Sequence, residues 1–337
     1  MKVLRNSILL LFLAASLFSF SQDDTLPYVR YKEKIVLYTD LGFSTAPFKV
    51  VYPFTETITK LKYKNNMSLV LGLGVSYKWF ALRLGIALPG TIRPPSRYGR
   101  TQYYDLGFDF SVKRAFFDVD LHVYNGYAIK NAYRWNDSLN HLTPNDLRPE
   151  LTSVSFSINT WIFRNPHFKM TPFRGKTGLY TKDIHSFYIK PTFNVHGAGS
   201  NGKDPLIPYQ LEDTNQTKTS AHSITAVDLG VVPGMVYVKR WKSFQVGAMG
   251  GLGFVVQSKF YQSDSINRGF LGLAPRFDIK FIAGYNQPRY FVMFVTDFDN
   301  KSIRFNDLAY RQTFYNIKIV GGIRLDRKKK KEKPKED

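Results

Sequence analysis

The residue types best suited to chemistry in this sequence are histidines and one short motif. The chain has six histidines and no cysteine, and no two histidines show the i, i+4 spacing by which a helix presents two ligands to zinc. The motif HGAGS, residues 196–200, places a histidine and a serine where an expected strand enters a loop. A nucleophilic triad there would need partners from other strands. We therefore predict no catalytic residues, no metal site and no cofactor, and we keep a hydrolase as the last of three alternatives.

A different chemistry is indicated by the stretch YDLGFDFSVKRAFFDVDLHVYNGY, residues 104–127. Aspartates and one histidine alternate with large apolar residues, which is the period of a strand whose two faces meet different surroundings. Lys113 and Arg114 interrupt the pattern and predict a tight turn, so the stretch reads as a β-hairpin. A soluble β-sandwich and a membrane barrel both fit this hairpin, with opposite faces pointing inward.

The N-terminus favours the membrane alternative, because it has the pattern of a secretory signal peptide. Lys2 and Arg5 precede an apolar run over residues 8–20, and Ser19 and Ser21 offer small residues for cleavage. The run is too short for a membrane-spanning helix, which needs about 20 residues. We expect a signal peptide at 1–21 and a mature chain that lacks the cysteine of a bacterial lipoprotein.

Alternation with period two recurs along the whole mature chain, and no helical period of useful length appears. Expected turns at Lys78, Lys113, Asn165, Arg240 and Gln287 alternate with expected long loops at 90–101, 126–150, 197–221, 258–273 and 299–312. Short turns on one side and long loops on the other are typical of outer-membrane barrels. The expected strands are 33–44, 68–77, 79–89, 102–112, 115–125, 151–163, 167–196 with an interruption, 222–238, 243–257, 274–285, 289–298 and 313–325.

Aromatic residues gather beside the expected turns, as in a girdle at a membrane interface. They include Trp79, Trp161, Phe163, Trp241 and Tyr290. We therefore predict an all-β fold, a single antiparallel transmembrane β-barrel of about 12 strands (range ~10–14). Its expected parts are a periplasmic segment at 22–32, the barrel at 33–325 and a basic disordered tail at 326–337.

In such a barrel the apolar face meets lipid and the polar face meets a water-containing lumen. The lumen-facing candidates are Arg83, Asp105, Asp109, Asp118, Asp120, His122, Lys190, Asp228, Arg276, Asp278, Lys280 and Lys318. Acidic and basic groups are mixed, and unpaired charges in a partly dry lumen are unfavourable. We therefore expect ion pairs that narrow the lumen.

The formal charge of the chain is +21, and about +19 once the signal peptide is removed. Export argues against a nucleic-acid partner, and the anions at a Gram-negative surface are lipid phosphates, including those of lipopolysaccharide. Arg93, Arg97 and Arg100 fall in the expected long loop after the third strand, and we predict that they contact such phosphates. The barrel-assembly machinery is a second expected partner, and the sequence leaves the oligomeric state open.

One segment resembles a known family. YKNNMSLVLGLGVSYKW, residues 63–79, is similar to the exported proteins of Bacteroidota grouped as domain of unknown function 4421. Further similar segments are YNGY at 124–127, LRPEL at 147–151 and GYN at 284–286. The resemblance covers about residues 33–325 and implies an outer-membrane β-barrel. It implies no activity and no catalytic residues.

Three functions remain open from the sequence. The first is a narrow pore or structural barrel with a charged lumen, and the second is a barrel that binds a surface or assembly partner through basic extracellular loops. The hydrolase is the third. Balanced lumen charge favours the first.

Overall fold

The computed structural model describes residues 26–201, 204–264 and 266–326. The expected signal peptide and nearly all of the expected basic tail lie outside these residues. Among the described residues, no helix is long and apolar enough to cross a membrane.

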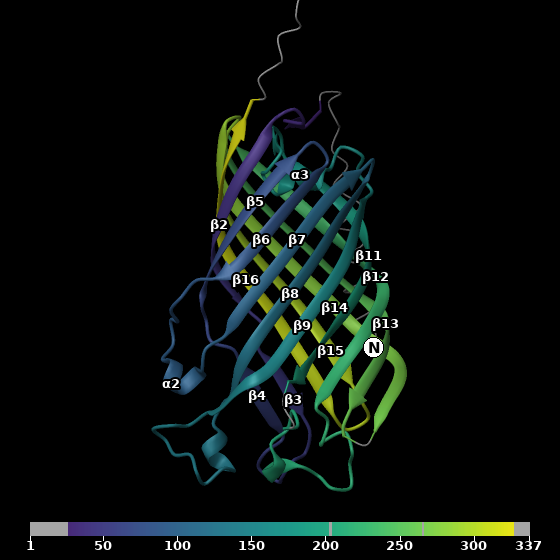
Figure 1. The fold of residues 1–337 in the computed structure, drawn as a ribbon. Helices are drawn as coiled ribbons and strands as arrows, with labels where there is room; N and C mark the ends of the chain where they lie inside the picture. Colours follow the sequence, from purple (N-terminus) through teal and green to yellow (C-terminus); the bar gives the residue numbers. More distant parts are fainter. Residues whose placement is uncertain (1–25, 202–203, 265, 327–337) are drawn as a thin grey trace, which may run out of the picture.

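Twelve antiparallel strands of the described chain form a closed ring, which confirms the predicted barrel (Figure 1). They are β2 (Ile35–Thr45), β5 (Leu69–Tyr77), β6 (Phe80–Ala87), β7 (Gln102–Val112), β8 (Ala115–Ile129), β9 (Asp146–Phe163), β11 (Ile184–Ser200), β12 (Ser223–Trp241), β13 (Phe244–Gln262), β14 (Asn267–Asn286), β15 (Tyr290–Arg304) and β16 (Ala309–Leu325). The ring closes where β16 pairs with β2, with Ile319 opposite Leu41. Two shorter strands, β3 (Phe48–Val51) and β4 (Lys60–Lys64), fill the wall between β16 and β8 at one end.

The two ends of the barrel differ. At the end that we call the short-turn end, at the top of Figure 1, tight turns at Lys78, Lys113 and Lys242 join consecutive strands. The opposite, long-loop end carries residues 88–101, with the short helix α2 (Pro95–Tyr98), and residues 130–145. The turns predicted at Lys78, Lys113 and Gln287 are confirmed, and the one predicted at Arg240 lies two residues later.

Two predicted long loops are wrong. Residues 258–273 and 299–312 belong mostly to strands, with connections only at 263–266 and 305–308. The strands β13 and β14 have 19 and 20 residues, whereas about 9–11 residues cross a membrane. On β15 the outward residues beyond the apolar belt are Asn300, Ser302 and Arg304, so there the apolar alternation fades while the backbone ladder continues.

The outer face of the barrel is apolar over its middle. Leu252, Phe254, Leu271 and Leu273 are each at least 67% exposed, and glycines, Gly253 and Gly272, occupy the inward positions between them. Burying such a belt in lipid removes apolar surface from water. The structure is therefore a transmembrane β-barrel of the outer-membrane type.

Buried apolar side chains gather in two clusters, one toward each end of the lumen. The short-turn cluster contains Trp161, Phe163, Phe168, Phe173 and Tyr180 among others. Trp161 and Phe163 were expected in the outer aromatic girdle, which is wrong for both: they point inward and are 4% and 3% exposed.

The short-turn cluster depends on a segment that the sequence pattern did not reveal. Asn165 was expected at a tight turn, but residues 164–183 form a longer connection with the helix α3 (Met170–Phe173) and the strand β10 (Gly178–Tyr180). β10 pairs with β1 (Tyr28–Arg30). Figure 1 labels α3 at the short-turn end of the barrel. We call residues 164–183 the inner segment.

The long-loop cluster is built from strand residues and from the connection between β11 and β12. Inside the wall, Phe48 stacks on Tyr63 and meets Tyr127 edge to face. Leu206 and Ile207 of the connection are 1% exposed. Apolar side chains therefore occupy the lumen at both ends, and its middle is left to polar groups.

Candidate functional site

A cavity of about 220 Å³ lies between the two apolar clusters and is large enough to hold several water molecules. We call it the chamber. Its charged lining comprises Asp40, Asp109, Asp118, Asp120, Asp278, Asp297, Asp299, Arg83, Arg174, Lys176, Lys190, Arg276, Lys280, Lys301 and Lys318. Acids and bases are nearly balanced, as the sequence predicted for the lumen.

One group of charges is centred on Arg83 of β6. Its Nε and Nη2 lie 2.5 and 2.6 Å from the two carboxylate oxygens of Asp40 on β2. Its Nη1 donates to Asp105 of β7, which also accepts a 2.6 Å hydrogen bond from the Tyr103 hydroxyl. Gly72 of the intervening β5 faces this ion pair, and a Cβ there would collide with the Asp40 carboxylate. The glycine therefore gives the bidentate pair its space.

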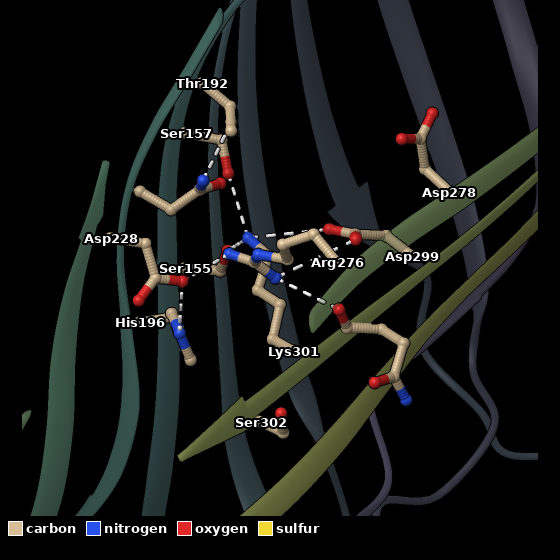
Figure 2. Close-up of polar contacts among 12 residues, drawn as sticks. Ser155, Ser157, Thr192, His196, Asp228, Arg276, Asp278, Asp299, Lys301 and Ser302 are labelled. Carbon is tan, nitrogen blue, oxygen red and sulfur yellow. Dashed lines mark hydrogen bonds and ion pairs between the residues drawn. The ribbon is translucent and has the colours of Figure 1, made fainter. Parts of the chain in front are cut away.

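A second group is centred on Asp228 of β12 (Figure 2). Oδ2 of Asp228 lies 2.7 Å from Nη2 of Arg276 and 3.0 Å from Nε2 of His196. Oδ1 accepts a 2.8 Å hydrogen bond from Gln257. The carboxylate is 1% exposed, and these three donors replace the water that it has lost.

Lys301 of β15 lies beside this group, as Figure 2 shows. Its ammonium donates to Oγ of Ser155 at 2.5 Å and of Ser157 at 2.9 Å, and it lies 3.7 Å from Asp299. Lys301 is 2% exposed, so a charge near the middle of the barrel is held by strand β9 and by one carboxylate.

A third group joins the inner segment to the barrel wall. Nη1 of Arg174 lies 2.9 Å from Asp109 of β7, and Nη2 donates to Asp118 of β8. Nζ of Lys176 lies 3.2 Å from Asp109 and 3.0 Å from the Tyr38 hydroxyl. The inner segment is thus attached to the wall by ion pairs inside the lumen.

The other candidate residues also face the lumen. Lys190 pairs with Asp278 at 2.5 Å and Lys280 with Asp297 at 2.9 Å. Nδ1 of His122 lies 3.1 Å from the Tyr103 hydroxyl. Asp120 and Lys318 line the chamber, and neither has an ion pair among the described residues.

The structure therefore brings all twelve lumen candidates inside the barrel, with Asp105 and Asp228 just behind the chamber surface. Sequence reasoning missed Asp40, Arg174, Lys176, Asp297, Asp299 and Lys301. Asp297, Asp299 and Lys301 alternate with Phe298 and Asn300, so the period-two signal continues into the predicted loop at 299–312. Arg174 and Lys176 lie in the inner segment, where no strand period could reveal them.

The HGAGS motif does not form a catalytic pair. His196 and Ser200 are four residues apart on β11, which is about 13 Å in an extended strand. His196 uses Nε2 for Asp228, and its buried Nδ1 has no hydrogen-bond partner among the described residues. The histidine serves the Asp228 group. Within the described residues, no cluster of three or more histidines or carboxylates has the arrangement of a metal site.

Arg93, Arg97 and Arg100 lie on the 88–101 connection at the long-loop end. The Arg93 guanidinium lies over the Tyr98 ring, 5.1 Å from its centroid. Asn66 holds the connection through 2.7 and 3.2 Å hydrogen bonds to the carbonyls of Gly99 and Arg93. Their predicted contact with lipid phosphates stays a prediction.

Solved structures with a similar course of the chain are outer-membrane barrels. The outer membrane protease OmpT from Escherichia coli has a TM-score of 0.40 and 8% identity, covering 90% of this chain and 99% of that one. The translocator domain of the autotransporter NalP from Neisseria meningitidis has a TM-score of 0.38, 8% identity and 96% of each chain covered. The toluene transporter TodX of Pseudomonas putida has a TM-score of 0.31 and 8% identity, covering 88% and 91%. These likenesses carry no argument about activity, and the barrel assignment rests on the ring of strands described above.

No curated protein sequence matches the chain. The family model described as domain of unknown function (DUF4421) matches residues 23–324. This match spans most of the chain and agrees with the resemblance carried by residues 63–79. The chain therefore belongs to the family described as domain of unknown function (DUF4421).

Proposed function

We propose that this protein is a narrow, closed barrel pore of the outer membrane, reached by signal-peptide export, whose resting conductance is small or absent. The observation that carries the proposal is the position of the charged chamber between two apolar clusters. Twelve strands fall between the filled barrels of about eight strands and the open channels of about 16–18, so the lumen contents decide the conductance.

Closure at the short-turn end depends on the inner segment. Gln245 of β13 donates 3.0 Å hydrogen bonds to the carbonyls of Pro172 and Phe173. Arg324 of β16 donates to the carbonyl of Gly175 at 2.5 Å and to that of Lys176 at 2.7 Å. Two strands on the wall thus bind the backbone of the segment, while Phe168 and Phe173 fill the space inside.

Closure at the long-loop end depends on the connection between β11 and β12. The Tyr63 hydroxyl donates to the carbonyl of Leu206 at 2.5 Å, and Nη2 of Arg148 donates to that of Pro205 at 2.7 Å. Leu206, Ile207 and Leu211 are buried in the long-loop cluster. An ion would have to cross apolar side chains at either end, where it loses its hydration without gaining a partner.

The inner segment offers the sharpest test. Arg174→Gln with Lys176→Gln removes its ion pairs to Asp109 and Asp118 while leaving the Gln245 and Arg324 contacts in place. We expect the wild type to give little or no current in planar-bilayer recordings. The double variant should give frequent openings, because the inner segment is then more often displaced from the lumen.

Lys34→Gln is the matched control, since it removes an ion pair with Asp326 at the same end that does not involve the inner segment. Asp109→Asn with Asp118→Asn breaks the same pairs from the wall side and should act like the double variant. Traces of both lumen variants that match the wild type would refute closure by the inner segment, as would a large steady current in the wild type.

A second candidate function, binding through the basic long-loop end, is favoured by exposed cations that lack acidic partners on that surface. The hydrolase alternative has less support, because His196 is occupied by Asp228 and is far from Ser200 along the strand. A hydrolase assay of His196→Gln beside the wild type would test it, and a loss of activity in that variant would restore the alternative.

A further inference from the structure

Three cationic side chains lie side by side on neighbouring strands at the long-loop end. Arg311 of β16 is directly opposite Lys49 of β3, and Lys49 is directly opposite Lys62 of β4. We call these three residues the cationic row. Lys130, just after β8, continues it, since its backbone N–H donates to the carbonyl of Lys62 at 2.9 Å. Figure 1 shows β3 and β4 at this end of the barrel.

The cationic row faces outward. The residues beside its members along the strands, among them Phe48, Leu61 and Tyr310, are at most 1% exposed and belong to the long-loop cluster. Because side chains alternate across a strand, Lys49, Lys62 and Arg311 must point away from the lumen, and all three are exposed.

Nothing on the described surface neutralises the cationic row. None of its three members has an ion pair with a described residue. Neighbouring strands are about 4.8 Å apart, and like charges directly opposite each other across two strands are unfavourable. Three such charges in register are therefore expected to have an anionic partner outside the chain.

The height of the cationic row indicates which anion that is. On β16 the outward side chains after Arg311 are Thr313, then Tyr315, Ile317 and Ile319, the last three being 40–57% exposed. Arg311 and Tyr315 are four residues apart, about 13 Å along the strand and about 10 Å along the barrel axis at a tilt near 45°. The cationic row thus lies just beyond the apolar belt, at the level of lipid headgroups.

We propose that Lys49, Lys62 and Arg311 form a binding site for the phosphate groups of a phosphorylated lipid in the outer leaflet. The Arg311 guanidinium offers a planar fork of donors that fits phosphate, and the two lysines add charge on adjacent strands. The acyl chains of the same lipid would lie along the exposed isoleucines of β16. This site is separate from the lumen and does not depend on conductance.

The test compares Lys49→Gln/Lys62→Gln/Arg311→Gln with the wild type. The control is Lys32→Gln/Arg114→Gln/Arg289→Gln, which removes three exposed cations near the short-turn end. Purified protein is titrated with bis-phosphorylated lipid A and with the same lipid after its phosphates are removed, and bound lipid is counted by native mass spectrometry. A heat-dependent shift in gel mobility shows that each variant is a folded barrel.

We expect the wild type and the control to prefer the phosphorylated lipid. The triple variant should lose about a hundredfold in affinity, since each cation near an anionic surface contributes roughly fivefold, and the loss should shrink as salt rises. Equal affinity of the triple variant and the wild type would overturn the proposal. So would full competition by millimolar inorganic phosphate, because that would make the site one for free phosphate. If the triple variant does not fold, Lys49→Gln and Arg311→Gln alone are each expected to lose about fivefold, and no loss in either would also reject the site.

Discussion

At the scale of single residues, Arg83 neutralises two buried carboxylates of the lumen. It lies between Asp40 and Asp105, which are 2% and 6% exposed, and it bonds both carboxylates. Two buried negative charges so close together are tolerable only with the guanidinium between them. The alternation of the sequence predicted Arg83 and Asp105 as inward residues, but not Asp40, since only the registers of β2, β5 and β6 show that these strands bring the three side chains together.

Replacing Arg83 should therefore destabilise the barrel strongly. We expect Arg83→Gln to lower the free energy of unfolding by about 3–5 kcal/mol, because it leaves two buried carboxylates unpaired. The triple variant with Asp40→Asn and Asp105→Asn should recover most of the loss. Urea unfolding in lipid vesicles, followed by tryptophan fluorescence, measures both. Arg289→Gln at the exposed short-turn end is the control, and a loss below about 1 kcal/mol in Arg83→Gln would mean that water already screens this pair.

At the scale of elements, the connection between β11 and β12 is held over the long-loop mouth by a contact with Tyr52. The hydroxyl donates to Asp213. Burial, with a smaller effect of this hydrogen bond, raises the pKa of Tyr52 to about 12. The same hydrogen bond is the main reason that the pKa of the Asp213 carboxyl is lowered from its usual value.

The directions of the two pKa shifts define the pH range over which this contact stabilises the fold. A lowered pKa of Asp213 stabilises the folded form above the ordinary carboxyl value of about 4, and that contribution is lost as the pH falls through the lowered value. A raised pKa of Tyr52 stabilises it below about pH 10, and that contribution is lost as the pH rises through about 12. The contact is therefore fully present between about pH 4 and pH 10.

Tyr52→Phe should loosen this connection at neutral pH. We expect backbone amides in residues 204–222 to exchange hydrogen about twofold to tenfold faster at pH 7. The difference from the wild type should shrink as the pH falls through the lowered pKa of Asp213. Tyr104→Phe, an exposed tyrosine on β7, is the control. Equal exchange in Tyr52→Phe and the wild type at pH 7 would show that the hydrogen bond does not hold the connection.

The elements also show what the sequence could and could not predict. Strand positions followed from alternation because lipid and lumen impose opposite polarity on successive residues, and eleven of the twelve ring strands were expected within a few residues over the membrane. The strand expected at 167–196 was wrong over its first part, because β11 begins at Ile184 and residues 167–183 belong to the inner segment. The inner segment was not predicted, since its burial depends on the closed ring of strands around it. Trp161 was placed wrongly for the same reason. An aromatic residue beside a turn suits either the outer aromatic girdle or a buried inner cluster, and the inner cluster exists only because the inner segment packs inside the barrel.

At the scale of the whole molecule, the barrel has three layers along its axis. Apolar clusters occupy both ends of the lumen, and ion-paired charges line a cavity of about 220 Å³ between them. The balanced signs within this layer favour neither cations nor anions, so opening one end would give a weakly selective passage. The sequence predicted the mixed charge, but the identity of each pair depends on how the registers of distant strands combine, which no local pattern contains.

The central claim, a chamber closed at both ends of an outer-membrane barrel, is tested most directly by thiol labelling. The chain has no cysteine, so each introduced cysteine is unique. Ser157→Cys places a thiol in the chamber lining, Ser138→Cys places one on the exposed long-loop end, and Arg289→Cys places one at the short-turn end. A bulky, membrane-impermeant maleimide is applied to intact cells and then to cells with a permeabilised outer membrane.

We expect Ser138→Cys to be labelled in intact cells and Arg289→Cys only after permeabilisation, while Ser157→Cys is labelled only after denaturation. Labelling of native Ser157→Cys at the rate of Ser138→Cys would contradict the closed chamber. Absence of Ser138→Cys labelling in intact cells would contradict an outer-membrane barrel whose long-loop end faces the outside of the cell.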